Sequence, residues 1–309
     1  MKYRTLGSTG LSVSVVGVGT WQFGGEWGRD YTQPEADAIF DAARECGINL
    51  IDTAECYGDH ASEAFIGRAI RRDRDRWVVA TKFGHRFNAP FDRSEPRSAE
   101  DVQKQLEDSL AALQTDRIDL YQYHSWGDDA FFDDAVLALL HKCKDQGKVR
   151  HLGNSVRKKD YLQQVEASKE RGIEAIQLIY NRLTRGPEDE VLPTCIEQDL
   201  GVLARVPLAS GYLTGKYKPG HRFDENEVRG RFHKRDERER LLEEAAKVQR
   251  DEVPEGVDMA QWALGWVLRH PAVSCVIPGC KDAGQVRSNA AAAGLDAVKK
   301  DHPRAVEAS

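Results

Sequence analysis

Short runs of β-branched and apolar residues alternate with longer amphipathic stretches from Val15 to Pro278, at similar intervals. Strand-length runs separated by helix-length stretches are typical of repeated βα units, which build a parallel sheet covered by helices. The predicted strands begin near Val15, Asn49, Trp77, Ile118, Val149, Ala175, Val202 and Val273. Such a set of units can close into a (β/α)8 barrel or lie open as a doubly wound sheet.

The stretches between the strands carry apolar residues at helical spacing, and several end at a glycine typical of a helix C-terminus. The predicted helices span 33–46, 63–71, 98–114, 132–146, 160–171, 191–199 and 259–269, with another after residue 281. The first 14 residues alternate around Gly7-Ser8-Thr9-Gly10. This pattern predicts an N-terminal β-hairpin, which in a barrel would close the bottom.

Two glycine motifs of open nucleotide-binding folds are incomplete in this chain. After Gly17 and Gly19, Gln22 stands where the dinucleotide-binding motif needs its third glycine. The segment 211–216 fails as a phosphate-binding P-loop, because its glycines are one residue too close and Tyr217 replaces the hydroxyl residue. We therefore expect an α/β protein with a (β/α)8 TIM barrel behind an N-terminal β-hairpin.

The interval between the seventh and eighth predicted strands is about twice the others and is dense in Lys, Arg, Asp and Glu at 217–244. We interpret 217–244 as a mobile, charged insertion on the top face, with a solvated loop of no function as the alternative. The whole chain, 1–309, is then predicted to be a single barrel domain.

Charge and composition limit the classes of binding partner that we expect for this chain. The chain has 44 basic and 50 acidic residues, a net charge of -6, so we expect no nucleic-acid and no membrane partner. No apolar run approaches the roughly 20 residues that span a bilayer, and no signal peptide is recognisable. The six cysteines lack metal-binding spacing and are predicted to be reduced, mostly buried thiols. These features predict a soluble, cytoplasmic protein, for which a monomer is plausible and the oligomeric state is not specified.

Three successive predicted strands end in an ionisable residue, namely Asp52, Lys82 and His124. The carboxyl ends of barrel strands meet at one face, so these side chains are expected to lie together. A metal site, a Schiff-base lyase and an acid/base centre are the candidates. A lysine ammonium repels a metal ion, and a lyase needs a neutral lysine, which Asp52 would oppose. The remaining hypothesis is a charged Lys82 that lowers the pKa of a neighbouring acid, with Tyr57 as the candidate.

Asp52-Thr53-Ala54 with Tyr57-Gly58, then Thr81-Lys82, then His124 resembles the catalytic tetrad of the aldo-keto reductases. The resemblance covers nearly the whole chain. It extends to segments 3–11, 17–21, 153–155, 207–216 and 277–279, and to Gln177, Tyr180, Asn181, Gln285 and Asn289.

This resemblance implies a barrel that binds NADPH, with NADH as an alternative, and reduces a small aldehyde or ketone to an alcohol by hydride transfer. Tyr57 would be the general acid that protonates the carbonyl oxygen, and Lys82 would lower its pKa. Asp52 would fix Lys82, and His124 would orient the carbonyl. No metal is implied. A cofactor-binding sensor or regulatory barrel with little turnover is the alternative, which the presence of all four residues disfavours.

The cofactor-binding residues implied by the resemblance are Thr20, Trp21, Asp52, Ser155, Gln177, Arg205, Pro207, Leu208, Ser210, Gly211, Lys216, Gly279, Lys281, Gln285 and Asn289. Ser155 and Gln177 match positions that hold the nicotinamide carboxamide. Arg205 is expected to stack on the nicotinamide, where many members have an aromatic residue. Lys281 is expected to contact the adenosine 2'-phosphate and Arg287 to face elsewhere.

Trp21, Trp27 and Trp126 lie just beyond strand ends and are predicted to form the wall of the substrate pocket, with ordinary core packing as the alternative. Other histidines have no partner at a telling spacing and are predicted to be solvated or structural, among them His60, His85, His151, His221, His233 and His270.

Overall fold

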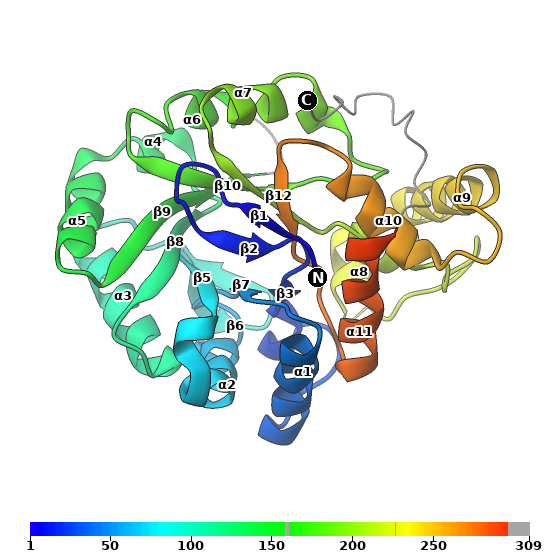
Figure 1. Ribbon diagram of the computed structural model, residues 1–309, viewed down its shortest axis with the longest axis horizontal. Helices are drawn as coiled ribbons and strands as arrows, with labels where there is room; N and C mark the ends of the chain where they lie inside the picture. The colour runs from blue at the N-terminus through cyan, green and yellow to red at the C-terminus, as the bar shows by residue number, and fades with distance from the viewer. Residues whose placement is uncertain (158–160, 226, 296–309) are drawn as a thin grey trace.

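Eight parallel strands form the centre of the protein in a computed structural model that describes residues 1–157, 161–225 and 227–295 (Figure 1). They lie in the order β12-β11-β10-β9-β8-β5-β4-β3. Their bounds are β3 Val18–Gly19, β4 Leu50–Asp52, β5 Val78–Phe83, β8 Ile118–His124, β9 Val149–Ser155, β10 Ile173–Ile179, β11 Gly201–Arg205 and β12 Val273–Val276. Each predicted strand start lies within three residues of an observed strand.

The first and last strands of this sheet are joined, which closes the barrel. Parallel bridges link Val16 to Val276 and Gly19 to Gly279. A side chain at Gly19 would not fit between them, because its Cβ would lie 2.7 Å from the carbonyl oxygen of Ile277. The closed barrel, and not the open sheet, is therefore confirmed.

Helices pack around the barrel largely where they were predicted (Figure 1). The α-helices are α1 Gln33–Glu45, α2 Ala61–Ile70, α3 Ala99–Leu113, α4 Asp128–Phe131, α5 Asp134–Asp145, α6 Leu162–Glu166, α7 Val191–Glu197, α8 Val228–Phe232, α9 Arg235–Asp251, α10 Met259–Leu268 and α11 Ala283–Ala291. The 3-10 helices are η1 Trp21–Gly24, η2 Arg71–Arg76, η3 Gly186–Glu188, η4 Ala209–Thr214 and η5 Ala292–Gly294.

The helices predicted at 132–146 and 160–171 differ most from the observed ones, and both are shorter than expected. The helix predicted at 132–146 begins at Asp134 because Asp133 caps it, accepting from the backbone N–H groups of Ala135 and Val136. The helix predicted at 160–171 is observed only as α6, and its first predicted residue lies outside the described part of the chain.

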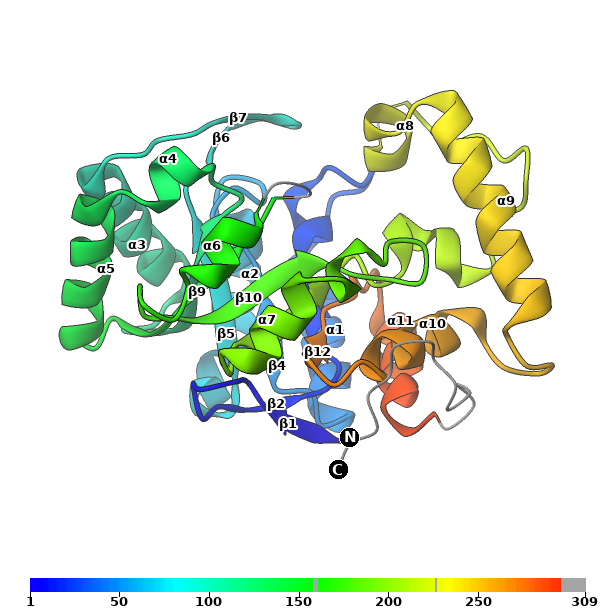
Figure 2. The same cartoon turned by 90° about the horizontal axis from the view of Figure 1, so that it is seen from above.

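The predicted N-terminal hairpin consists of β1 Tyr3–Thr5 and β2 Ser12–Ser14, paired antiparallel. It lies at one end of the barrel (Figure 2). Leu6, Leu11 and Val13 of this hairpin pack with the apolar residues that the strands point inward, including Leu50 and Leu120. The bottom of the barrel is thus closed by apolar packing, as predicted.

The opposite end carries two additions to the barrel (Figure 2). A second antiparallel hairpin, β6 Arg86–Ala89 and β7 Asp92–Ser94, follows β5 and was not predicted. The charged segment 217–244 contains α8 and the first part of α9. Within the described residues, no helix is both long and apolar enough to cross a membrane.

Candidate active site

A cavity of about 640 Å³ lies at the carboxyl ends of the barrel strands. Asp52, His124 and Arg205 are the last residues of β4, β8 and β11, and all three line this cavity. The strand geometry thus brings together side chains that are far apart in the sequence, as the barrel prediction required.

Lys82 is fully buried in β5, where its ammonium donates to Asp52 Oδ1 at 2.8 Å and to the carbonyl oxygen of Thr53 at 2.7 Å. The second carboxylate oxygen of Asp52 accepts from Gln177 Nε2 at 2.6 Å. Burial opposes the ammonium form, but the charge of Asp52 and the hydrogen bond to it help to raise the pKa of Lys82 above its usual value. Lys82 is therefore charged.

Tyr57 lies in the loop after β4, close against η1. This approach requires glycine at position 24, because a Cβ there would lie 3.0 Å from backbone atoms of Tyr57 and Gly58. Lys82 Nζ lies 5.2 Å from the centre of the Tyr57 ring. Burial raises the pKa of Tyr57 to about 12, against the opposing charges of Lys82 and Arg205. Lys82 acts in the predicted direction, but the loss of solvent is larger, so the net shift is upward and Tyr57 is a protonated phenol.

His124 faces Tyr57 across the cavity wall, with their ring centres 6.1 Å apart. The ring of His85 lies 4.6 Å from that of His124. Burial, followed by the positive charges of His85 and Lys82, holds the pKa of His124 well below its usual value. The imidazole is therefore neutral, with one nitrogen that donates and one that accepts.

Trp21 and Trp27 line the cavity and meet edge to face, 5.3 Å apart, and Trp21 stacks on Tyr57 at 6.2 Å. Trp126 does not line it. This residue is fully buried, and its indole N–H donates to the carbonyl oxygen of Gly84 at 3.1 Å. The prediction for Trp126 is corrected accordingly: it packs in the core, because its ring lies among the aromatic residues of β5 and β8.

Most of the residues predicted to bind the cofactor line the cavity, namely Thr20, Trp21, Asp52, Gln177, Arg205, Pro207, Leu208, Ser210, Gly211, Lys216, Gly279, Lys281 and Gln285. Ser155 and Asn289 do not. Ser155 Oγ donates to Gln177 Oε1 at 3.3 Å, and the buried Asn289 Nδ2 lies 3.3 Å from Cys280 Sγ. The prediction that these two residues contact the ligand directly is therefore corrected. Ser155 supports Gln177, and Asn289 supports Cys280.

The donor set on one side of the cavity fits a phosphorylated ligand. The backbone of Ser210 and Gly211 is left-handed, with φ of 55° and 93°, and a Cβ on Gly211 would lie 3.4 Å from Arg229 Nη1. Lys216, Arg229 and Lys281 bring cations to this same lining from three segments. A sharply turned, glycine-containing backbone bordered by cations suits the phosphates of a dinucleotide. Arg287, in contrast, pairs with Glu45 and is not part of the lining.

Several lining residues were not predicted. His85, Phe91, Arg93 and Glu95 come from the unpredicted β6–β7 hairpin and its flanks. His85 lies only three residues beyond Lys82. This short spacing was the sequence feature that could have indicated a place in the cavity lining. Tyr217 and Arg229 belong to the charged segment 217–244 and also line the cavity.

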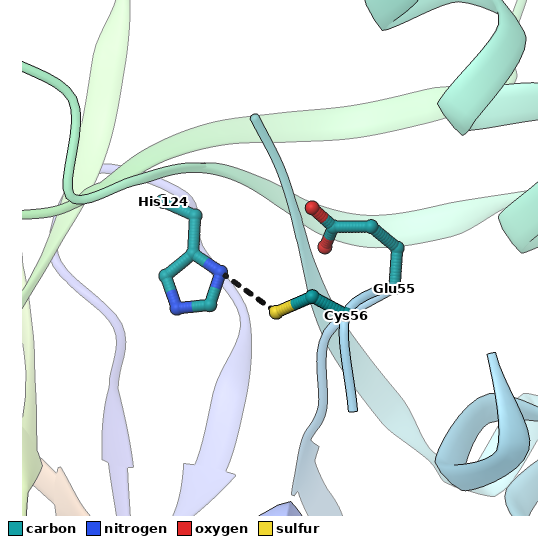
Figure 3. A group of neighbouring side chains, drawn as sticks. All are labelled: Glu55, Cys56 and His124. Carbon is teal, nitrogen blue, oxygen red and sulfur yellow. Dashed lines mark hydrogen bonds between the residues drawn. The ribbon is translucent and has the colours of Figure 1, made fainter. Parts of the chain in front are cut away.

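A buried cluster adjoins this site, and the sequence analysis did not identify it. Glu55, Cys56 and His124 bring one ligand-type atom each within 4.8 Å of one another (Figure 3). Glu55 Oε1 accepts from the backbone N–H of His85 at 2.9 Å. Burial raises the pKa of Glu55 to about 8.

The chain is a closed (β/α)8 barrel. A charged lysine, a carboxylate, a tyrosine and a neutral histidine lie at the carboxyl ends of its strands. Sequence comparison identifies the oxidoreductase class to which this barrel belongs. Residues 15–309 match the model of the Aldo/keto reductase family. The chain belongs to this family and has the oxidoreductase activity of aldo-keto reductases, which use NAD(P)H.

Individual relatives agree with this assignment. The chain is 31% identical over 303 residues to aldo-keto reductase YhdN of Bacillus subtilis (strain 168), covering 93% of this chain and 87% of the relative. It is 31% identical over 337 residues to the NADH-specific methylglyoxal reductase of Escherichia coli (strain K12), covering 97% and 96%. The holo form of aldo-keto reductase AKR11C1 from Bacillus halodurans superposes with a TM-score of 0.82 at 28% identity, covering 98% and 94%.

Proposed function

We propose that this protein reduces small aldehydes or ketones with NADPH and that Tyr57 is the general acid. One observation supports this proposal most strongly. The buried Lys82–Asp52 ion pair lies beside the Tyr57 ring, and the neutral ring of His124, 6.1 Å from the Tyr57 ring, lines the same cavity. The protonated phenol can donate a proton to an oxygen. The charged lysine cannot accept that proton, and the neutral imidazole can donate a hydrogen bond to the same oxygen.

When bound, the dinucleotide supplies the hydride that reduces the carbonyl carbon. Tyr57 gives its phenolic proton to the carbonyl oxygen, which prevents a negative charge from building up there. The ammonium of Lys82, held by Asp52, stabilises the tyrosinate that remains. An N–H of His124 donates to the same carbonyl oxygen and orients it. Trp21 and Trp27 form the apolar wall beside the reacting carbon.

The remaining lining residues would hold the dinucleotide. Gln177 faces the cavity and is placed for the nicotinamide amide, with Ser155 fixing its carbonyl end. Arg205 lines the cavity, and its Nη2 donates to the carbonyl oxygen of Val156 at 3.1 Å, which suits a plane stacked on the nicotinamide ring. Ser210, Gly211 and Lys216 line the cavity and would hold the pyrophosphate.

NADPH is proposed over NADH because of Lys281. This residue lines the cavity just before α11, while its backbone N–H donates to Gln285 Oε1 at 3.0 Å. The ammonium can therefore pair with a 2'-phosphate, which NADH lacks. Because one relative is an NADH-specific methylglyoxal reductase, the two dinucleotides are compared directly in the test.

The test is the oxidation of NADPH and of NADH by the purified protein with a panel of aldehydes, ketones and sugars. Turnover that depends on a carbonyl, is faster with NADPH and is lost in Tyr57→Phe would support the proposal. Tight dinucleotide binding without turnover on any carbonyl would contradict it and would favour a sensor.

A further inference from the structure

The thiol of Cys56 contacts the ring of His124 through one nitrogen. Cys56 Sγ lies 3.7 Å from His124 Nδ1, within hydrogen-bond distance for sulfur (Figure 3). Cys56 is 1% exposed and does not line the cavity, whereas His124 does. The thiol therefore touches His124 from within the protein and cannot touch a ligand in the cavity.

The direction of this hydrogen bond decides which nitrogen of His124 carries the proton. If the thiol donates, Nδ1 is the acceptor and Nε2 carries the ring proton. If Nδ1 donates instead, Nε2 has no proton and cannot donate to a carbonyl oxygen. An imidazole nitrogen accepts strongly and a thiol sulfur only weakly, so the first direction is favoured.

The charge of Arg93 and the burial of the thiol favour the same direction. The positive charge of Arg93 acts on the Cys56 sulfur. Because a guanidinium has no acceptor atom, it cannot take the thiol proton, which stays available for Nδ1. Burial raises the pKa of Cys56 far above its usual range, so the group is a thiol with a proton to donate.

Arg93 is itself fixed. Its Nη2 donates to Glu26 Oε2 at 2.6 Å, and Glu26 also accepts from Trp21 Nε1 at 2.6 Å and from the backbone N–H of Phe91 at 2.7 Å. Glu26 is 1% exposed. The β6–β7 hairpin thereby holds the guanidinium whose charge acts on the Cys56 sulfur.

A metal ion is the other occupant that Glu55, Cys56 and His124 could suggest. Neither Glu55 nor Cys56 lines the cavity, and the positive charges of Arg93 and Lys82 act on the Cys56 thiol. A divalent cation would be repelled by both. The cluster is therefore better suited to a proton than to a metal.

We propose that Cys56 is a positioning residue that donates to His124 Nδ1 and so holds His124 in the tautomer whose Nε2–H is free for a ligand. That the ligand is a carbonyl oxygen rests on the proposed function. The tautomer itself does not.

The test measures the tautomer directly, in the full chain with 15N-labelled histidine. Long-range 1H–15N spectra distinguish a protonated Nδ1 from a protonated Nε2, and the His124→Asn variant identifies the signals of His124. We expect the Nε2–H form in the wild type and in Cys56→Ser, which keeps a donor. In Cys56→Ala the Nδ1–H form should rise several-fold. Cys143→Ala, which removes another buried thiol from α5, should leave the spectrum of His124 unchanged.

A wild-type ring protonated at Nδ1, a metal-bound Nδ1, or an unchanged tautomer in Cys56→Ala would each overturn the inference. If Cys56→Ala does not fold, the wild type and Cys56→Ser still decide it. In the reductase assay, we expect Cys56→Ala to lower kcat roughly tenfold and Cys56→Ser to restore most of it. If the wild type reduces no carbonyl, the proposed function is wrong. The spectra would still show which nitrogen of His124 carries the proton.

Discussion

The ammonium of Lys82 and the carboxylate of Asp52 meet at 2.8 Å with side chains only 1% and 6% exposed. They come from neighbouring strands, β5 and β4. Thr53 and Gln177 satisfy further hydrogen bonds of the pair. A buried pair of this kind is stable because each charge has a partner, so removal of one partner leaves the other charge uncompensated.

We expect Lys82→Met to lower the free energy of unfolding by about 3–5 kcal/mol, the usual cost of an uncompensated buried charge. Carbonyl reduction should also be lost. Chemical denaturation measures the first effect and steady-state kinetics the second. Lys104→Met removes an exposed partner of Asp108 and should change stability by less than about 1 kcal/mol. Equal effects of the two substitutions would contradict the assignment.

Tyr57→Phe should lower kcat by roughly 10²-fold or more, because the general acid is gone while the ring that fills the site remains. Dinucleotide affinity should stay nearly the same, as measured by quenching of tryptophan fluorescence. Tyr121→Phe is the matched control, since it removes a buried hydroxyl that has no hydrogen-bond partner among the described residues. Unchanged turnover in Tyr57→Phe would exclude Tyr57 as the acid.

Lys281→Ala should weaken NADPH binding by about 1–3 kcal/mol, the range for a hydrogen bond to a charged group, and leave NADH binding nearly unchanged. Arg287→Ala removes a cation nearby in sequence that pairs with Glu45, so it should affect neither dinucleotide. Titration of both dinucleotides into the three proteins makes the comparison. An equal loss for NADPH and NADH in Lys281→Ala would show that Lys281 does not recognise the 2'-phosphate.

Glu55 should make the protein less stable as the pH rises. Burial raises the pKa of Glu55 from 4.5 to about 8, so the folded protein keeps this proton where the unfolded chain has lost it. The stabilising contribution is complete below about pH 4.5 and is lost as the pH rises through about 8. Glu55→Gln removes the titration, so the stability of the variant relative to the wild type should rise between pH 5 and pH 8. Parallel stability curves for the two proteins over this interval would show that the carboxyl is not shifted.

Sequence periodicity predicted the strands, and the incomplete glycine motifs favoured the barrel over an open sheet. Asp52, Lys82 and His124 could be located because each lies at the carboxyl end of a strand or one residue before it. Tyr57 followed from its resemblance to a known motif. Arg93 and the rest of the β6–β7 hairpin could not be predicted in this way, because its strands have only four and three residues and residues 86–94 are all exposed or half-buried.

The burial of individual side chains was also beyond sequence reasoning. Trp126 and Trp21 both follow a strand end, yet one packs in the core and the other lines the cavity. Ser155 and Asn289 stand at the expected places in the chain but face protein groups. The contact between Cys56 and His124 joins residues 68 positions apart, and no local pattern records it.

The hydrogen bonds of Asp52, Lys82 and Gln177 tie strands β4, β5 and β10 together across the top of the barrel. Natural selection for a folded barrel would therefore preserve these residues even in a descendant that no longer turned over a carbonyl. Tyr57 stands on a loop outside this network, and a change there is the less costly one for folding. In a lineage drifting from enzyme to binding protein, the tyrosine should be lost first, and the buried ion pair would persist as a trace of the ancestral chemistry.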